Sequence, residues 1–349
     1  MAYQNVGTPR FFIDHGLWLY TLGAYTPDDD QIPFIQLNPT NVMTRPTNQL
    51  TVPRVAPINY IAFLGTEEST STDANGLSNA IGYYPEWYGV YDPDDPEDIT
   101  LYHSTADGFT EIVNCDWYSQ DPETYNGFSM ATFTDNSTYP YLRGIMAFDA
   151  KCGAVSIGST YEMPNSPNLS LNVSREYGGT KEITTYNGGS MSNTMRNKAP
   201  KWGDLGAWEL GSKDSTSHQS TSDTAMQKLS RTGRRAWDLK FSYIDDGDLW
   251  GSNQMLSNIA ENITTGLGYE SGDIANSATF NENLLTDDSF FSQVWHKTLG
   301  GTLPFIFQAD KDNNNPDQFA ICRFVDNSLK ATQSAFNVYD ISLKIEEVW

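Results

Sequence analysis

The stretch RRAWDLKFSYIDDGD, residues Arg234 to Asp248, has the sharpest alternation of apolar and polar side chains in this sequence. Successive side chains of a β-strand point to opposite faces of a sheet, so residues two positions apart share a face. The apolar face consists of Trp237, Leu239, Phe241 and Tyr243, and the polar face of Asp238, Lys240 and Ser242. This pattern predicts a strand with one face in the core and the other in water.

The last residues, NVYDISLKIEEVW (337–349), repeat this alternation, with Ile341, Leu343 and Ile345 on one side. Terminal residues fray unless a sheet or a docking contact holds them. We therefore expect the chain to end in a core strand that completes a sheet. Removal of that strand should unfold the domain around it.

Between these two stretches, TDDSFFSQVWHKTLGG (286–301) predicts a short amphipathic helix. Thr286 or Asp287 can cap its start, and the pair Gly300 and Gly301 can end it. Its apolar residues at helical spacing are Phe291, Val294, Trp295 and Leu299. TLPFIF (302–307) and QFAICRFV (318–325) predict two more strands that cover this helix. The predicted core of the region is Trp237, Leu239, Phe241, Tyr243, Trp295, Ile341, Leu343 and Ile345.

The first half of the chain contains short apolar runs separated by Pro, Asn, Asp and Gly, such as INYIAFLG (58–65) and YLRGIMAFDA (141–150). Apolar runs of this length between turn signals are typical of strands. The sequence therefore predicts a mainly β protein with two β-sandwich domains, residues 1–165 and residues 166–349. The Ser- and Thr-rich segment 211–233 has little apolar surface to bury and is predicted to be an exposed loop of the second domain.

Composition excludes several function classes. The chain has 349 residues, with 44 acidic and 21 basic residues, and its formal net charge is −23. This charge repels nucleic-acid phosphates, and the short basic cluster Arg231, Arg234 and Arg235 does not offset it. No apolar run approaches the ~18 residues of a spanning helix. We expect neither sequence-specific nucleic-acid binding nor membrane insertion, and we see no signal peptide.

Neither a catalytic motif nor a cofactor motif is present in the sequence. The four histidines are not spaced as metal ligands, and the acids Asp245, Asp246 and Asp248 need no function in so acidic a chain. The three scattered cysteines lack a C-x-x-C pair, so they predict neither a disulfide framework nor a zinc site. We expect a protein that is not an enzyme and uses no cofactor.

Two segments supply candidate ligand-binding residues. In the loop ADKDNNNPDQ, the candidate metal ligands Asp310, Asp312 and Asn314 have the opening spacing of a calcium loop. Asn315 then replaces the turn glycine and Ile321 the closing glutamate, which favours a plain hairpin loop. In YYPEWYGVYDPDD (83–95), the aromatic side chains could stack on sugars, contact a protein partner or fill a core. These aromatic candidates are Tyr83, Tyr84, Trp87 and Tyr88.

Three long segments together carry a resemblance to a family: GRRAWDLKFSYIDDGDLW, FFSQVWHKTLGGTLPFIFQADKDNNNPDQFAICRF and NVYDISLKIEEVW. They resemble the C-terminal part of tail proteins of tailed bacteriophages, particularly aquatic phages, of the distal-tail or baseplate-hub type. NPTNVMTRP and APINYIAFLG resemble the jelly-roll, carbohydrate-binding-like module that is often joined to such a domain. After the second of these, TEESTST departs from the family's usual histidine-asparagine pair.

The resemblance implies a structural protein of the virion, made in the host cytoplasm. It implies a homo-oligomeric ring or collar in the distal tail or baseplate, which contacts tube, hub and fibre proteins. One hypothesis is that acidic residues line a channel for DNA; a solvated acidic surface is the alternative. Other open functions are fibre attachment, head decoration, host-glycan binding by residues 1–165, and polysaccharide cleavage by a carboxylate pair.

Overall fold

The computed structural model describes residues 6–27, 32–37, 43–44, 49–53, 55–64, 86–88, 101–102, 116–117, 128–132, 141–145, 151–152, 154–176, 182–192, 234–251, 284–285, 287–314 and 318–348. Its strands up to the middle of the chain are β1 (Arg10–Asp14), β2 (Met43–Thr44), β3 (Gln49–Pro53), β4 (Tyr60–Leu64), β5 (Glu86–Tyr88), β6 (Leu101–Tyr102), β7 (Asp116–Trp117), β8 (Phe128–Thr132), β9 (Tyr141–Ile145), β10 (Lys151–Cys152) and β11 (Ala154–Glu162). The later strands are β12 (Asn172–Glu176), β13 (Glu182–Thr184), β14 (Ser190–Ser192), β15 (Arg234–Asp245), β16 (Phe305–Gln308), β17 (Phe319–Phe324), β18 (Ala331–Ala335) and β19 (Val338–Glu347). The helices are α1 (His15–Thr21), α2 (Ile32–Ile35), α4 (Asp246–Trp250) and the π-helix η3 (Phe291–His296).

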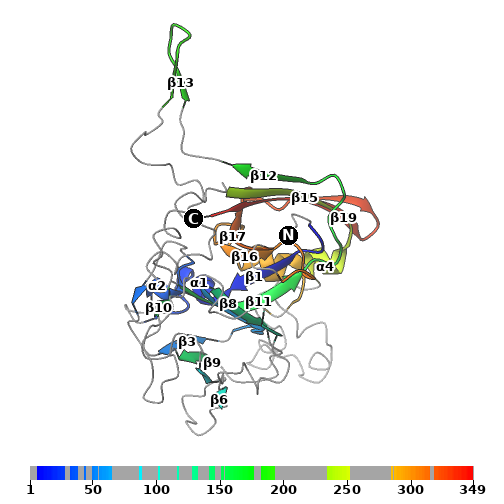
Figure 1. The fold of residues 1–349 in the computed structure, drawn as a ribbon. Coiled ribbons are helices and arrows are strands. Elements are labelled where there is room, and N and C mark those ends of the chain that lie inside the picture. The colour runs from blue at the N-terminus through cyan, green and yellow to red at the C-terminus, as the bar shows by residue number, and fades with distance from the viewer. Residues whose placement is uncertain are drawn as a thin grey trace, which may run out of the picture.

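One antiparallel sheet of 11 strands organises the described part of the chain (Figure 1). Its order is β12-β15-β19-β17-β16-β1-β11-β4-β8-β7, and β18 also pairs with β19. A 4-stranded sheet, β3-β9-β5-β6, and two 2-stranded sheets complete the set. The expected mainly β class is therefore confirmed, as are the strands expected within 58–65, 141–150, 302–307 and 318–325.

The large sheet contains strands from both sides of residue 165. Strand β1 pairs with β11 on one side and with β16 on the other, so Phe11 lies between Tyr161 and Phe307. Two separate sandwiches are consequently not confirmed, because backbone hydrogen bonds join the expected first and second domains. The first strand of the chain could not be assigned to this place from local sequence, since its partner β16 lies almost 300 residues further along.

The end of the chain is a central strand, as predicted. Strand β19 pairs with β15 along most of its length and with β17 and β18 on its other edge. Ile341, Leu343 and Ile345 are buried, and Trp237, Leu239 and Phe241 face them across the ladder. The terminal residues that the structure describes are thus part of the core; Trp349 lies outside the described residues.

Tyr243 was expected in the core, and this prediction is wrong. The register between β15 and β19 shifts between Phe241 and Ile244, which marks a β-bulge. Tyr243 has a φ of 61° and is 79% exposed, whereas the next residue, Ile244, is buried. The extra residue in the bulge moves the apolar alternation by one position, so Ile244 takes the place in the core that the pattern assigned to Tyr243.

A helix is present where one was predicted, but it is the 6-residue π-helix η3 (Phe291–His296). Val294 and Trp295 are buried in η3, and Asp287 accepts hydrogen bonds from the hydroxyls of Ser289 and Ser292 at its start. Gly300 and Gly301 follow with positive φ angles of 67° and 84°, as expected of a helix stop. Trp295 is therefore confirmed as a core residue.

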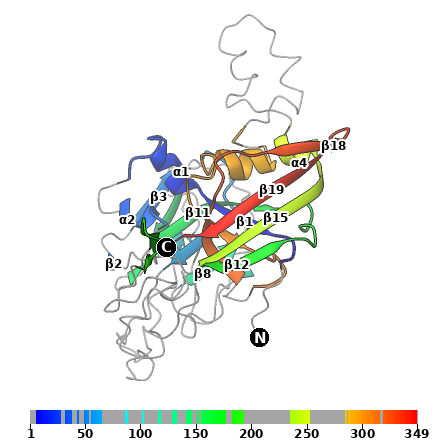
Figure 2. The same ribbon diagram turned by 90° about the horizontal axis from the view of Figure 1, so that it is seen from above.

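The core lies on both faces of the central strands. Phe11, Phe305 and Phe307 face one cluster, which also holds the buried side of β15, β19 and η3. Phe12, Ile306 and Ile321 face a second cluster together with β4. Strands that are buried on both faces read as continuous apolar runs, as FFI and PFIF do here. Figure 2, viewed from above, shows β12, β15, β19 and β18 side by side, with β15 and β19 running across the view.

The Ser- and Thr-rich segment 211–233, which was expected to be an exposed loop, lies outside the described residues. Strands β13 and β14 form a small hairpin apart from the large sheet, whose turn is closed by a hydrogen bond from Thr185 N to Gly189 O, with Tyr186 exposed. Among the helices that the structure describes, none is long and apolar enough to cross a membrane.

Candidate functional site

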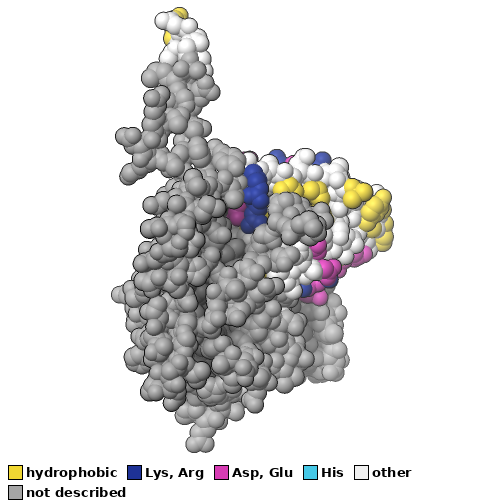
Figure 3. Space-filling view, in the orientation of Figure 1, with side chains coloured by type: hydrophobic (Ala, Val, Ile, Leu, Met, Phe, Trp, Pro, Cys, Tyr) yellow, Lys and Arg dark blue, Asp and Glu magenta, His cyan; other side chains and the backbone are white. Residues whose placement is uncertain are grey.

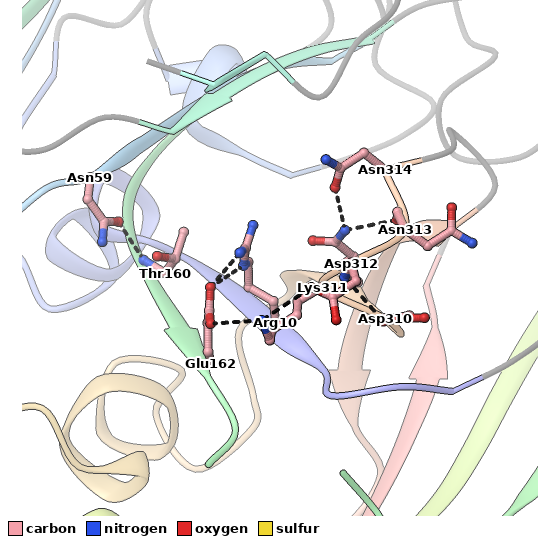
Figure 4. A network of polar contacts seen from close by, with 10 residues as sticks. Arg10, Asn59, Thr160, Glu162, Asp310, Lys311, Asp312, Asn313 and Asn314 are labelled. Carbon is pink, nitrogen blue, oxygen red and sulfur yellow. Dashed lines mark hydrogen bonds and ion pairs between the residues drawn. The ribbon is translucent and has the colours of Figure 1, made fainter. Parts of the chain in front are cut away.

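The candidate calcium ligands lie in the connection between β16 and β17 and do not form a ligand set. Asp310 Oδ1 accepts a hydrogen bond from the backbone N of Asp312 at 3.1 Å. Asn314 Oδ1 accepts one from Gln308 Nε2 at 2.9 Å, so it faces the strand end. Figure 4 shows these side chains around the loop. The hairpin-loop interpretation fits, because Asp310 holds the loop backbone and Asn314 holds the side chain of Gln308 at the end of β16.

Two basic side chains accompany the carboxylates at this place. Lys311 Nζ lies 3.3 Å from Asp312 Oδ1 and 4.0 Å from Glu162 Oε2. Arg10, on β1, forms an ion pair with Glu162, on β11 (Figure 4). Two cations, Arg10 and Lys311, lie beside the carboxylates of Glu162 and Asp312 and offset most of the local negative charge. This network joins β1, β11 and the loop, and it is best described as a surface clamp.

A buried polar cluster connects β1, α1 and β11 to η3. His15 Nε2 lies 2.9 Å from Ser159 Oγ, and the Ser159 hydroxyl donates to Gln293 Oε1 at 3.2 Å. Lys297 Nζ donates to the same Gln293 oxygen at 2.6 Å. His15 and Lys297 are fully buried. Gly158 permits this approach, because a Cβ at that position would lie 1.8 Å from Ile13 O.

Burial dominates the electrostatics of this cluster. It lowers the pKa of Lys297 to about 7 and lowers the pKa of His15 well below 6.5, with Lys297 as a second cause for the histidine. Burial raises the pKa of Asp14 to about 7, although the backbone N of Leu17 donates to its carboxylate. A lysine that loses its charge near neutral pH is a possible nucleophile or base. Here it is sealed in the core, and we interpret the cluster as a structural link between the sheet and η3.

A buried ion pair fixes the end of the chain. Arg235 Nη2 lies 2.8 Å from Glu347 Oε1 and also donates to Phe319 O at 2.8 Å. The guanidinium lies over the Trp237 ring, 5.4 Å from its centre. Arg235 is therefore paired inside the protein, with the carboxylate of Glu347 and the carbonyl oxygen of Phe319.

The described surface exposes aromatic side chains at the far end of β15, β19 and β18. Phe336 is 88% exposed in the tight turn between β18 and β19, next to Asn337 with a φ of 58°. Tyr243 projects from the bulge of β15, and its backbone N donates to Asp340 Oδ1 at 3.2 Å. The half-buried rings of Tyr339 and Trp250 meet edge to face at 6.4 Å. We call Tyr243, Phe336, Tyr339 and Trp250 the aromatic end; Figure 3 shows apolar side chains gathered at this end of the sheet.

Carboxylates surround the aromatic end. Asp245 and Asp246 join β15 to α4, Asp248 lies within α4, and Asp340 lies on β19. Burial raises the pKa of Asp248, and the neighbouring carboxylates of Asp245 and Asp288 add to this effect. The aromatic end therefore combines exposed rings with a negative border.

Sequence reasoning missed this surface and proposed other aromatic residues. Tyr83 and Tyr84 lie outside the described residues, and Trp87 and Tyr88 belong to β5 but their side chains lie outside the described part. The sequence contains one signal for the aromatic end: Tyr243 is followed by another apolar residue, Ile244, which breaks the alternation. Such a break predicts a bulge only when the partner strand is known.

Comparisons with protein-family models, with curated proteins and with solved structures found no match to this chain. Within the described ranges, no group of three or more His, Cys, Asp or Glu side chains is placed to hold a metal ion. The aromatic end is thus the surface from which a function can be argued.

Proposed function

We propose that this chain is a structural protein of a tailed-phage virion, which assembles with copies of itself into a ring or collar of the distal tail or baseplate. The family resemblance of the second half of the sequence supplies the biological setting. The structural observation that supports the proposal is the aromatic end, where the backbone holds exposed rings in fixed positions.

Tyr243 carries most of this argument. A positive φ is rare for a bulky residue and costs of the order of 1–3 kcal/mol. With regular pairing, this ring would point into the core, where its burial would stabilise the fold. The bulge instead turns the ring into water, although β15 is otherwise a regular core strand. Strain that exposes an aromatic side chain is a feature of binding surfaces rather than of cores.

The surroundings of Tyr243 support a protein partner. Aromatic residues are enriched in the centre of protein interfaces, where they bury a large area at a small cost in side-chain entropy. Phe336 lies in a turn whose backbone is held by the bond from Asp246 N to Asn337 O at 2.9 Å. Both rings are thus presented by paired strands, which suits an assembly contact that is repeated in every copy.

Two other functions remain proposals of lower rank. Host-glycan binding rests on the sequence of residues 83–88, and fibre attachment or head decoration rests on the acidic, β-rich composition. Neither uses the strained conformation of Tyr243, and we therefore place the ring or collar first.

Single-particle imaging of the purified full chain, with light-scattering mass over a range of concentrations, tests the proposal. We expect closed rings with a central opening. A particle with the mass of one chain at every concentration would contradict a self-assembling ring. A shapeless aggregate would do so as well, because it lacks the fixed rotation between copies that a closed ring requires.

A further inference from the structure

We propose that the aromatic end of one copy binds residues 196–201 of a neighbouring copy. This inference rests on the proposed function, because it names the surface and the chain segment through which copies would join. Residues 196–201, RNKAPK, lie outside the described residues, and their chemistry is known from the sequence. The rings and charges of the surface that would receive them are described by the structure.

Two segments build the aromatic end, and they contain acidic residues but no basic ones. They are residues 242–251, SYIDDGDLWG, and residues 331–340, ATQSAFNVYD. Neither contains Lys, Arg or His, and their acidic residues are Asp245, Asp246, Asp248 and Asp340. The basic residues next to them in sequence, Lys240 and Lys330, lie outside both segments.

The rest of this sheet face has a different balance of charge. Further along the strands, Asp238 lies opposite Lys344, and Arg323 forms an ion pair with Glu346 at 2.8 Å. Opposite charges thus offset each other there. At the aromatic end, none of the four carboxylates forms an ion pair with a described residue. The negative charge is therefore concentrated beside the exposed rings.

The pKa shifts at this end have the signs expected of a negative potential. Burial raises the pKa of Asp248, and the carboxylates of Asp245 and Asp288 raise it further. Burial also raises the pKa of the nearby Tyr161, and the carboxylates of Asp248, Asp288 and Asp287 add to that effect. Every neighbouring charge that acts on these two groups is a carboxylate, so a cation brought to this surface would be attracted.

Exposed rings beside carboxylates favour a cationic ligand. A guanidinium or ammonium group is attracted to the face of an aromatic ring within ~6 Å of its centre. The same group forms charge-assisted hydrogen bonds with carboxylates. Tyr243 and Phe336 are exposed rings of this kind, and Figure 3 shows acidic side chains beside the apolar ones at this end of the sheet. An acidic or purely apolar partner would leave the carboxylates without a counter-charge.

The chain itself contains a segment with the complementary chemistry. No acidic residue occurs from position 183 to position 203, and Arg196, Lys198 and Lys201 lie close together within this stretch. Met195 and Trp202 flank them and can add apolar contacts with the rings. In a chain of net charge −23, copies repel each other unless a basic part of one meets an acidic part of the next.

The other basic cluster of the sequence is a weaker candidate for this contact. Arg235 is buried in its ion pair with Glu347, and Arg234 lies opposite Glu176 of the edge strand β12. Their charges are thus already close to carboxylates of the same chain. The contact with residues 196–201 joins two different parts of the chain, so it is heterologous and can close into a ring when it is repeated.

Two variants of the full chain test the contact. The segment variant carries Arg196→Glu, Lys198→Glu and Lys201→Glu, and the surface variant carries Asp246→Lys and Asp248→Lys. Asp312→Lys with Asp326→Lys reverses two exposed charges outside the aromatic end and is the control. Circular dichroism and thermal melting establish that each variant is folded.

We expect the segment variant and the surface variant each to associate at least about tenfold more weakly than the wild type in light scattering, with the control unchanged. An equimolar mixture of the two variants should recover the wild-type mass, because each acidic part then meets a basic part of the other variant. Folded variants that assemble alone as the wild type does would overturn the inference. A mixture that stays dissociated would overturn it too, since a contact within one chain cannot be restored by mixing.

A labelled peptide of residues 193–203 tests the site without any change to the aromatic end. In fluorescence anisotropy it should bind the segment variant, whose own basic segment is removed, and bind at least about tenfold more weakly once Asp246→Lys and Asp248→Lys are added. Absence of peptide binding, or binding that ignores these two changes, would contradict the inference. A wild type that stays a single chain would instead contradict the proposed function.

Discussion

Replacement of the buried Lys297 by methionine should stabilise the protein, and the gain should depend on pH. The pKa of Lys297 is about 7 in the folded protein and 10.5 in a solvated chain, so the unfolded state binds more protons between these values. The free energy of unfolding of the wild type therefore rises with pH from about 7 to about 10.5. Below pH 7 the folded protein carries the full penalty of a buried ammonium.

The size of the effect follows from the same values. The difference between 10.5 and about 7 corresponds to roughly 5 kcal/mol, at about 1.36 kcal/mol for each pH unit. Methionine loses the hydrogen bond to Gln293, which offsets about 1 kcal/mol. We expect Lys297→Met to raise the free energy of unfolding by about 3 kcal/mol at pH 7 and by almost nothing near pH 10.

Asp14 has the opposite effect on the pH dependence of the free energy of unfolding, and it acts at lower pH. Its pKa is raised from 3.8 to about 7, so the folded state binds more protons between these values and the wild type loses stability as pH rises through this range. In Asp14→Asn that loss, roughly 4 kcal/mol in total, should disappear. Together, the contributions of Asp14 and Lys297 to the free energy of unfolding of the wild type should be smallest near pH 7.

Urea unfolding followed by tryptophan fluorescence at several pH values between 5 and 10 measures both effects. Lys344→Met is a matched control, because Lys344 is exposed on β19 and its replacement should change stability by less than about 0.5 kcal/mol. A Lys297→Met protein that is less stable than the wild type at pH 7, or equally stabilised at pH 7 and pH 10, would refute the reasoning.

Three further predictions concern the strands around the chain terminus. Phe241→Ala should cost about 3–5 kcal/mol in urea unfolding, because this ring is fully buried in the core; a midpoint close to the wild type would show that β15 is not a core strand. Glu347→Ala should cost a similar 3–5 kcal/mol in thermal melting, since it leaves the Arg235 guanidinium buried without its carboxylate. Tyr243→Gly should keep or raise the melting temperature while it weakens assembly, because glycine adopts a positive φ without strain; a large fall in melting temperature would show that the ring supports the fold.

The sequence was sufficient where periodicity and local signals acted alone. The alternation in β15 and β19 identified six of the eight expected core positions, and helical spacing identified Trp295 as a seventh. The expected glycine pair follows the helical segment, which ends at His296. These signals are local, since a strand face or a helix stop depends on residues only a few positions apart. The hairpin loop between β16 and β17 was predicted for the same reason.

The features that sequence reasoning missed depend on contacts between distant segments. The pairing of β1 with β16 joins the two expected domains, and no local pattern encodes a partner so far along the chain. The exposure of Tyr243 depends on the register between β15 and β19, and one extra residue reverses the face of every later side chain. The cluster of His15, Ser159 and Lys297 likewise comes from three separate elements. None of these residues stands in a recognisable motif.

The most direct test of the central claim is the light-scattering mass of the full chain beside that of Tyr243→Ser with Phe336→Ser. Both rings are exposed in the single chain, so the variant should fold as the wild type does. We predict a multimer for the wild type and a single chain for the variant at the same concentration. Equal masses for the two proteins would contradict the claim that the aromatic end is the surface of assembly.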